Sequence, residues 1–124
     1  MRMREEFGDR LWARLVLVVD DDPLVLDVAA RMPEDLGCDV VTAADAEEAL
    51  ETLADQRVEI LITDVNMPGM DGYELANTAV KMREDLKVIV LSGGARDGRG
   101  FPFIQKPFRQ ADLKEAMARN TGLC

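Results

Sequence analysis

Residues 61–72 read LITDVNMPGMDG, and they decide the fold because an apolar run ends there at a single aspartate, Asp64. The run from Val58 to Ile62 is too short for an amphipathic helix and is rich in β-branched residues, so it predicts a buried strand of a parallel sheet. Asp64 then lies where that strand ends. The Pro68-Gly69 and Asp71-Gly72 pairs that follow are turn signals, which predict a loop at the carboxyl edge of the sheet. Taken alone, Asp64 is better interpreted as a solvated or a helix-capping carboxylate.

The composition restricts the kind of protein. The chain has 124 residues, of which 48% are hydrophobic and 31% are charged, and this suits a single globular domain. Its net charge of −9 argues against nucleic acid or an anionic membrane as a partner, because both repel such a surface. Cys38 and Cys124 are too few and too far apart for a disulfide framework, so a reducing, cytoplasmic location is expected. No apolar run is long enough to span a membrane.

The chain also has no histidine, so any reaction that needs an imidazole must take it from another molecule.

Strand-like and helix-like segments alternate along the chain. The expected strands are 15–19, 39–42, 58–62, 87–91 and 103–105, and the expected helices are 23–32, 46–53, 73–82 and 112–119. This order is typical of an α/β fold in which helices cover both faces of a parallel sheet. Residues 1–13 are expected to be an N-terminal extension or linker, and residues 14–124 the domain.

Local signals refine the helices. Asp22 and Asp45 precede helical patterns as N-caps, and Asp22 is followed by a proline at the first helical position. Along the first helix one apolar residue recurs every four positions, which predicts a single apolar face made of Leu24, Val28, Met32 and Leu36. Pro33 has no N–H and is expected to kink that helix or end it near Met32, with Gly37 closing the unit. The core face of the third helix is expected to be Leu75, Ala79 and Met82.

Polar residues follow four of the predicted strands. Asp20 and Asp21 follow the first, Asp64 the third, Ser92 the fourth and Lys106 the fifth. Carboxylates crowded at one edge repel one another and need a cation or a raised pKa. Magnesium prefers such hard oxygen ligands, and a lysine and a hydroxyl beside it would neutralise a phosphoryl group. The set therefore indicates phosphoryl chemistry, with Asp64 as the nucleophile.

Four segments of this chain resemble the receiver domains of two-component response regulators. They are LVVDDD at 17–22, TDVNMPGMDG at 63–72, VLSG at 90–93 and KPF at 106–108. The resemblance covers about residues 15–120. It implies a flavodoxin-like three-layer sandwich with a five-stranded parallel sheet of strand order 2-1-3-4-5.

The resemblance also implies roles for individual residues. Asp64 would accept a phosphoryl group from a histidine on a partner histidine kinase or histidine phosphotransfer protein. Asp20, Asp21, Asp64 and the main-chain carbonyl of Asn66 would bind Mg²⁺. Ser92 and Lys106 would contact the phosphoryl group, and Phe103 matches the aromatic switch position. A receiver is a signalling domain rather than an enzyme, although it promotes its own phosphorylation and slow dephosphorylation.

The chain departs from the receivers of transcription factors between its last two strands. Those receivers usually carry a helix there, whereas residues 93–102 contain four glycines and a proline, so this helix is expected to be missing. In this respect the chain is more similar to the receivers of hybrid sensor histidine kinases than to those of transcription factors.

Two alternatives remain at the level of sequence. Asp20-Asp21-Asp22 also approximates the Asp-x-Asp motif of haloacid-dehalogenase-like phosphatases, with Asp20 as nucleophile and Asp22 as general acid. That interpretation gives no role to the loop around Asp64 and leaves no room for a substrate-selecting cap. The second alternative is a receiver-like binding module that is not phosphorylated.

Overall fold

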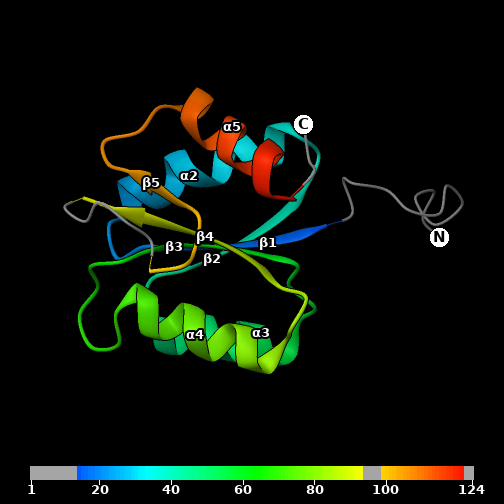
Figure 1. Cartoon of the computed structure of the whole chain (residues 1–124), viewed down its shortest axis with the longest axis vertical. Coiled ribbons are helices and arrows are strands. Elements are labelled where there is room, and N and C mark those ends of the chain that lie inside the picture. The colour runs from blue at the N-terminus through cyan, green and yellow to red at the C-terminus, as the bar shows by residue number, and fades with distance from the viewer. Residues whose placement is uncertain (1–13, 94–98, 122–124) are drawn as a thin grey trace, which may run out of the picture.

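A computed structural model describes residues 14–93 and 99–121 (Figure 1). The elements are β1 (Leu15–Val19), α2 (Pro23–Asp35), β2 (Asp39–Ala43), α3 (Ala46–Asp55), β3 (Ile60–Asp64), α4 (Gly72–Met82), β4 (Lys87–Ser92), β5 (Phe103–Gln105) and α5 (Gln110–Thr121). Residues 1–13, expected to be an extension or linker, and Cys124 lie outside the described residues. Among the helices described, none has the length and apolar character needed to cross a membrane.

The five strands form one parallel sheet in the order β2-β1-β3-β4-β5. Helices α2 and α5 lie on one face, and α3 and α4 lie on the other (Figure 1). This is the expected flavodoxin-like three-layer sandwich. Because all strands run the same way, the residues that follow them meet at one edge of the sheet.

Alternation of side chains along the central strands divides the core into two layers. Leu17, Leu61 and Val88 pack with the α3 and α4 side, whereas Val16, Ile62 and Ile89 pack with α2 and α5. The side chains of the central strands are almost completely buried, as expected for strands covered on both faces.

The predicted bounds of β1 and β5 agree with the structure, but β3 begins two residues later than expected, at Ile60. Asp64 is consequently the last residue of β3, paired with Leu91 of β4, rather than the second residue beyond the strand.

The prediction for α2 was wrong in two respects. Leu24 is 76% exposed and Val28 is 38% exposed, so neither belongs to the core, while Ala29 and Met32 do. An α-helix turns about 100° per residue, so a repeat of four drifts by about 40° per step and cannot stay on one face. The helix also continues past Met32 to Asp35. Pro33 lies in the last turn, where its missing N–H removes a single helical hydrogen bond, the one to the Ala29 carbonyl.

Helix α4 begins one residue earlier than predicted and ends at Met82, as predicted. Asp71 is its N-cap: its carboxylate accepts from the Glu74 N–H at 2.9 Å, and the Glu74 carboxylate accepts from the Asp71 N–H at 3.2 Å. The expected Asp71-Gly72 turn is therefore a capping box. At the other end Met82 is 47% exposed and not part of the core.

The connection between β4 and β5 is described only in part. Residues 93 and 99–102 contain no helix, in agreement with the expectation, while residues 94–98 lie outside the described residues. Phe101 and Phe103 are partly buried and pack against the core layer on the α3 and α4 side. Phe101 of the connection and Phe103 of β5 therefore extend the core layer on this side of the sheet.

Candidate functional site

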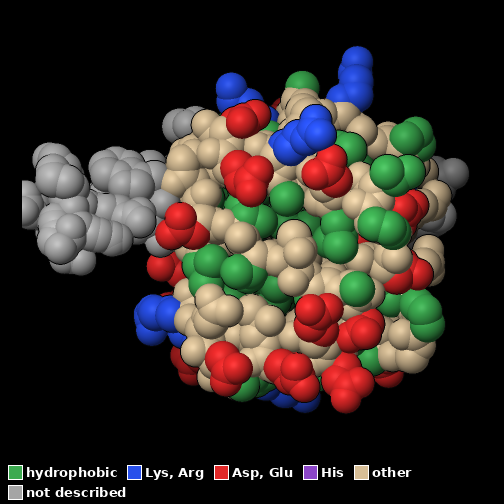
Figure 2. All heavy atoms as spheres, turned by 180° about the vertical axis from the view of Figure 1, so that it is seen from behind, with side chains coloured by type: hydrophobic (Ala, Val, Ile, Leu, Met, Phe, Trp, Pro, Cys, Tyr) green, Lys and Arg blue, Asp and Glu red, His purple; other side chains and the backbone are tan. Residues whose placement is uncertain are grey.

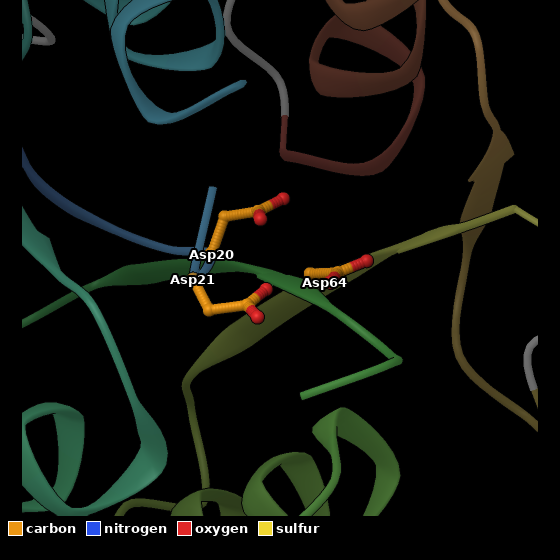
Figure 3. A group of neighbouring side chains, drawn as sticks. All are labelled: Asp20, Asp21 and Asp64. Carbon is orange, nitrogen blue, oxygen red and sulfur yellow. The ribbon is translucent and has the colours of Figure 1, made fainter. Parts of the chain in front are cut away.

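The carboxyl edge of the sheet gathers the predicted acidic residues. Asp20 follows β1 directly, Asp21 comes next, and Asp64 ends the neighbouring strand β3. One carboxylate oxygen from each of the three lies within 4.8 Å of the others, and Figure 3 shows the three carboxyl groups grouped together. Asp20 is 1% exposed and Asp64 is 4% exposed, whereas Asp21 lies at the surface. The group is thus open to solvent on the Asp21 side.

Lys106 joins this group from the residue that follows β5. Its Nζ lies 2.8 Å from Asp64 Oδ1 and 3.0 Å from Asp20 Oδ2. The other oxygen of Asp20, Oδ1, accepts a hydrogen bond from the Asp22 N–H at 2.9 Å. One ammonium group faces three carboxylates, so two negative charges are not neutralised within this group. That excess and the all-oxygen donor set fit a divalent hard cation such as Mg²⁺.

Electrostatics shift the pKa values of two members of the group. Burial raises the pKa of Asp64 above its usual 3.8, and the charges of Asp20 and Asp21 add to the rise, while the hydrogen bond from Lys106 opposes it. For Lys106, burial lowers the pKa, but the hydrogen bonds from its ammonium group to Asp64 and Asp20 outweigh burial and raise it above 10.5. Lys106 is therefore a fixed positive charge at neutral pH.

The backbone around Asp64 is held from two directions. The Val65 N–H donates to the Leu91 carbonyl at 2.9 Å, and the Thr63 hydroxyl donates to the Asp64 carbonyl at 2.9 Å. Gly72, the first residue of α4, lies against the same carbonyl: a Cβ on Gly72 would clash with the Asp64 carbonyl oxygen. No side chain fits there, so α4 can pack against the end of β3 only through a glycine.

Sequence reasoning missed both Thr63 and Gly72 as supports of the site. The Asp71-Gly72 pair predicts a turn, and this signal says nothing about a contact with Asp64. The close approach of Gly72 to the backbone of Asp64, eight residues earlier, leaves no periodic signal in the sequence.

The remaining predicted residues take their places as follows. Ser92 ends β4 and is completely buried, and its carbonyl accepts from the Lys106 N–H at 2.7 Å, which fixes Lys106 next to it. Phe103 is paired with Val90 and is half-buried. Asn66 is exposed, two residues beyond Asp64. The structure thus brings Asp20, Asp21, Asp64 and Lys106 into one group, with Ser92 beside Lys106.

Asp22, which would be the general acid in the phosphatase alternative, is the N-cap of α2. Its carboxylate accepts from the Leu24 N–H at 2.9 Å and caps α2. Lys106 also occupies the oxygen of Asp20 that the Asp22 N–H leaves open. These contacts favour a supporting role for both residues over that of a nucleophile and acid pair.

Comparison with known proteins gives a consistent result. The family model described as "Response regulator receiver domain" matches residues 16–118. The heme response regulator HssR of Staphylococcus aureus is 39% identical over 107 residues, covering 78% of this chain and 46% of the relative. The chain therefore spans about half the length of the curated relatives that it matches.

Solved structures are similar along most of the chain. A CheY-like response regulator receiver domain protein from Methanospirillum hungatei superposes with a TM-score of 0.78 at 30% identity, covering 86% of this chain and 91% of the other. The response regulator TrrA from Thermotoga maritima, solved in complex with Mg²⁺ and BeF, has a TM-score of 0.78 at 27% identity, covering 86% and 98%.

Proposed function

This chain belongs to the response regulator receiver domain family, and we propose that Asp64 accepts a phosphoryl group from a histidine of a partner protein, with Mg²⁺ as cofactor. The observation that carries the proposal is the group formed by Asp20, Asp21, Asp64 and Lys106 at the carboxyl edge of the sheet. The donor is a histidine kinase or a histidine phosphotransfer protein. The chain contains no histidine of its own, which agrees with a donor that comes from outside.

The transfer is a displacement at phosphorus. A carboxylate oxygen of Asp64 attacks the phosphorus of the phosphohistidine, an O–P bond forms, and the P–N bond breaks with its electron pair going to the imidazole. The product is an acyl phosphate on Asp64 and a free histidine on the donor. Lys106 holds Oδ1 of Asp64 at 2.8 Å, so Oδ2 is the oxygen that is left for the attack.

Asp20, Asp21, Asp64 and the main-chain carbonyl of Asn66 are the proposed Mg²⁺ ligands. When bound there, Mg²⁺ supplies the positive charge that phosphoryl transfer requires at the phosphoryl oxygens. The repulsion among these carboxylates is partly offset by Lys106, which forms ion pairs with both Asp20 and Asp64.

Ser92 and Lys106 are the proposed contacts of the phosphoryl group after transfer. Lys106 is positioned to follow the new charge because its ammonium group already contacts Asp64. The Ser92 hydroxyl would donate a hydrogen bond to a phosphoryl oxygen, and Phe103, half-buried on the next strand, would change its packing as Ser92 moves. The same arrangement would allow slow hydrolysis of the acyl phosphate, which makes this a signalling domain with limited self-dephosphorylation.

We further propose a cytoplasmic receiver of the kind carried by hybrid sensor histidine kinases, without direct contact with nucleic acid or membrane. The glycine-rich connection at 93–102 and the net charge of −9 support this finer assignment.

The function is tested by intact-mass measurement after incubation with acetyl phosphate and Mg²⁺. We expect the mass of one phosphoryl group to be added to the wild type and to Asp39→Asn, a control at an exposed carboxylate on β2, but not to Asp64→Asn. Labelling of Asp64→Asn that is lost only in Asp20→Asn would favour the phosphatase alternative. If the folded wild type is labelled neither by acetyl phosphate nor by any of a panel of phosphorylated histidine kinases, the unphosphorylated binding module would be favoured.

A further inference from the structure

A second charged site lies at the opposite edge of the sheet. A hollow of about 200 Å³ opens at the amino ends of β1, β3 and β4. Its charged walls come from three segments of the chain and consist of Arg14, Arg57, Glu59, Arg83, Asp85 and Lys87. Each of these strands is about 17 Å long, so this hollow is separate from the acidic group around Asp64.

The hollow is positively charged in a protein that is strongly negative. Four basic side chains face two carboxylates, which leaves an excess of two positive charges, whereas the whole chain carries −9. Figure 2 shows how widely carboxylate side chains are spread over one face of the molecule. A positively charged site on a negatively charged protein attracts anionic groups to that site.

The ion pairs within the hollow are long. Arg14 Nε lies 3.8 Å from Glu59 Oε1, and Arg57 Nη2 lies 3.7 Å from Asp85 Oδ2, compared with about 2.7–2.9 Å for a strong charge-assisted hydrogen bond. The side chains of Arg57 and Asp85 are both 72% exposed. Lys87 is exposed and forms no ion pair with another described residue. Arg57 and Lys87 therefore retain donors for a ligand.

Part of this positive charge has a structural explanation. Arg83 Nη2 donates to the carbonyl of Gln56 at 3.4 Å, and Gln56 is the C-cap of α3, where a cation offsets the partial negative charge of the helix end. The explanation does not extend to Arg57 and Lys87, whose side chains reach solvent. The helix end also disfavours a compact anion against the backbone. A ligand would instead meet the tips of the side chains.

We propose that this hollow, which we call the basic hollow, docks an acidic peptide segment of a partner protein through neighbouring carboxylates. Two adjacent Asp or Glu side chains match the excess of two positive charges, and their length lets them reach Arg57 and Lys87 without approaching the helix end. The proposal is independent of phosphorylation at Asp64, because the two sites lie at opposite edges of the sheet.

The test uses the whole chain, labelled with ¹⁵N, and a capped tetraglutamate peptide at low ionic strength. We expect amide shift changes concentrated at residues 14, 57–59 and 83–87, which weaken as NaCl is raised because exposed charges are screened within about 8–10 Å. A capped tetraglutamine peptide is the matched probe. An equal response to tetraglutamine, shifts scattered over the surface, or no shifts at millimolar peptide would overturn the proposal, as would equally tight binding of inorganic phosphate at the same residues.

Variants locate the contact. Arg57→Ser and Lys87→Ser should each weaken peptide binding by about two- to fivefold, as expected for one exposed ion pair, while Arg31→Ser on α2 should have no effect. Asp85→Asn removes a carboxylate that competes for Arg57, so it should bind the peptide more tightly than the wild type. A gain of affinity cannot come from loss of folding, and weaker binding by Asp85→Asn would contradict the proposed contact.

Discussion

Lys106 Nζ lies 2.8 Å from Asp64 Oδ1, and it contacts Asp20 Oδ2 at 3.0 Å with the same ammonium group. This one side chain therefore connects the carboxyl ends of β1, β3 and β5. Both aspartates are almost completely buried, and within the described part of the chain Lys106 is the basic residue that forms ion pairs with them. Lys106 thus stabilises the unphosphorylated domain as well as the phosphoryl group that we propose it will meet.

Replacing Lys106 by methionine should lower the free energy of unfolding by about 1–3 kcal/mol, because it leaves buried charged groups without their donor. Urea denaturation without divalent metal measures the effect, and Lys114→Met, an exposed lysine on α5, is the control. Equal stability of both variants would show that the ion pairs of Lys106 contribute nothing.

Magnesium should stabilise the wild type, because it binds the folded group of carboxylates and not the unfolded chain. A tenfold excess of Mg²⁺ over its dissociation constant would add about 1.4 kcal/mol. Asp21→Asn should melt no lower than the wild type without metal, since one repulsion is removed, and should lose most of the Mg²⁺ response. Asp55→Asn at the end of α3 should keep it. The same Mg²⁺-induced rise in Tm in Asp21→Asn would exclude this carboxylate as a ligand.

The affinity for Mg²⁺ should fall as the solution is acidified. A metal ligand must be deprotonated, and the pKa of Asp64 is raised by burial and by its acidic neighbours, so protons compete at a higher pH than for an ordinary aspartate with a pKa of 3.8. Below the raised pKa of Asp64, the apparent dissociation constant for Mg²⁺ should increase as the pH is lowered. Calorimetric titrations at several pH values measure this, and an affinity that stays constant until the pH nears 3.8 would contradict the raised pKa.

Replacing Gly72 by alanine should disturb Asp64 from a distance in sequence. The added methyl group would meet the Asp64 carbonyl oxygen, which is backbone and cannot rotate away, so α4 or the end of β3 must move. We expect a loss of about 1–3 kcal/mol in unfolding free energy and slower phosphorylation from acetyl phosphate. Gly93→Ala is the matched control, because a Cβ there meets no atom of the described residues within 4 Å. Similar losses in both variants would refute the role of close packing at Gly72.

The sequence was sufficient for features that depend on local chemistry. The apolar run at β1 ends where the acidic residues begin, and the carboxylates of Asp22 and Asp45 cap α2 and α3 as expected. The parallel direction of the strands was enough to predict that Asp20, Asp64 and Lys106 lie at one edge of the sheet. The strand order was predicted from the resemblance to the family.

Features that depend on packing between distant segments were not predictable. Leu24 belongs to the same four-residue repeat as Met32, yet it remains exposed, because the side of α2 that faces the sheet depends on how the helix packs. The contact of Gly72 with Asp64 depends on how closely α4 approaches β3, and the ion pairs of Lys106 depend on strands that are far apart in the chain.

The proposed switch predicts a local change between β4 and β5. The Lys106 N–H donates to the Ser92 carbonyl, and the Val90 N–H donates to the Pro102 carbonyl, so these bonds connect β4, which is the neighbour of Asp64, with β5. A phosphoryl group held by Ser92 and Lys106 would restrain both residues and so reduce the opening of the β4–β5 pairing.

Amide exchange with and without beryllofluoride and Mg²⁺ measures this restraint. We expect slower exchange at Val90, Phe103 and Lys106, with little change in α2, and we expect Ser92→Ala to lose much of the effect while still binding Mg²⁺. Phe103 is half-buried against the α3 and α4 side, so its amide should report repacking of β5. A uniform slowing over the whole domain would instead indicate general stabilisation by the ligand. It would mean that the phosphoryl group does not act through β4 and β5.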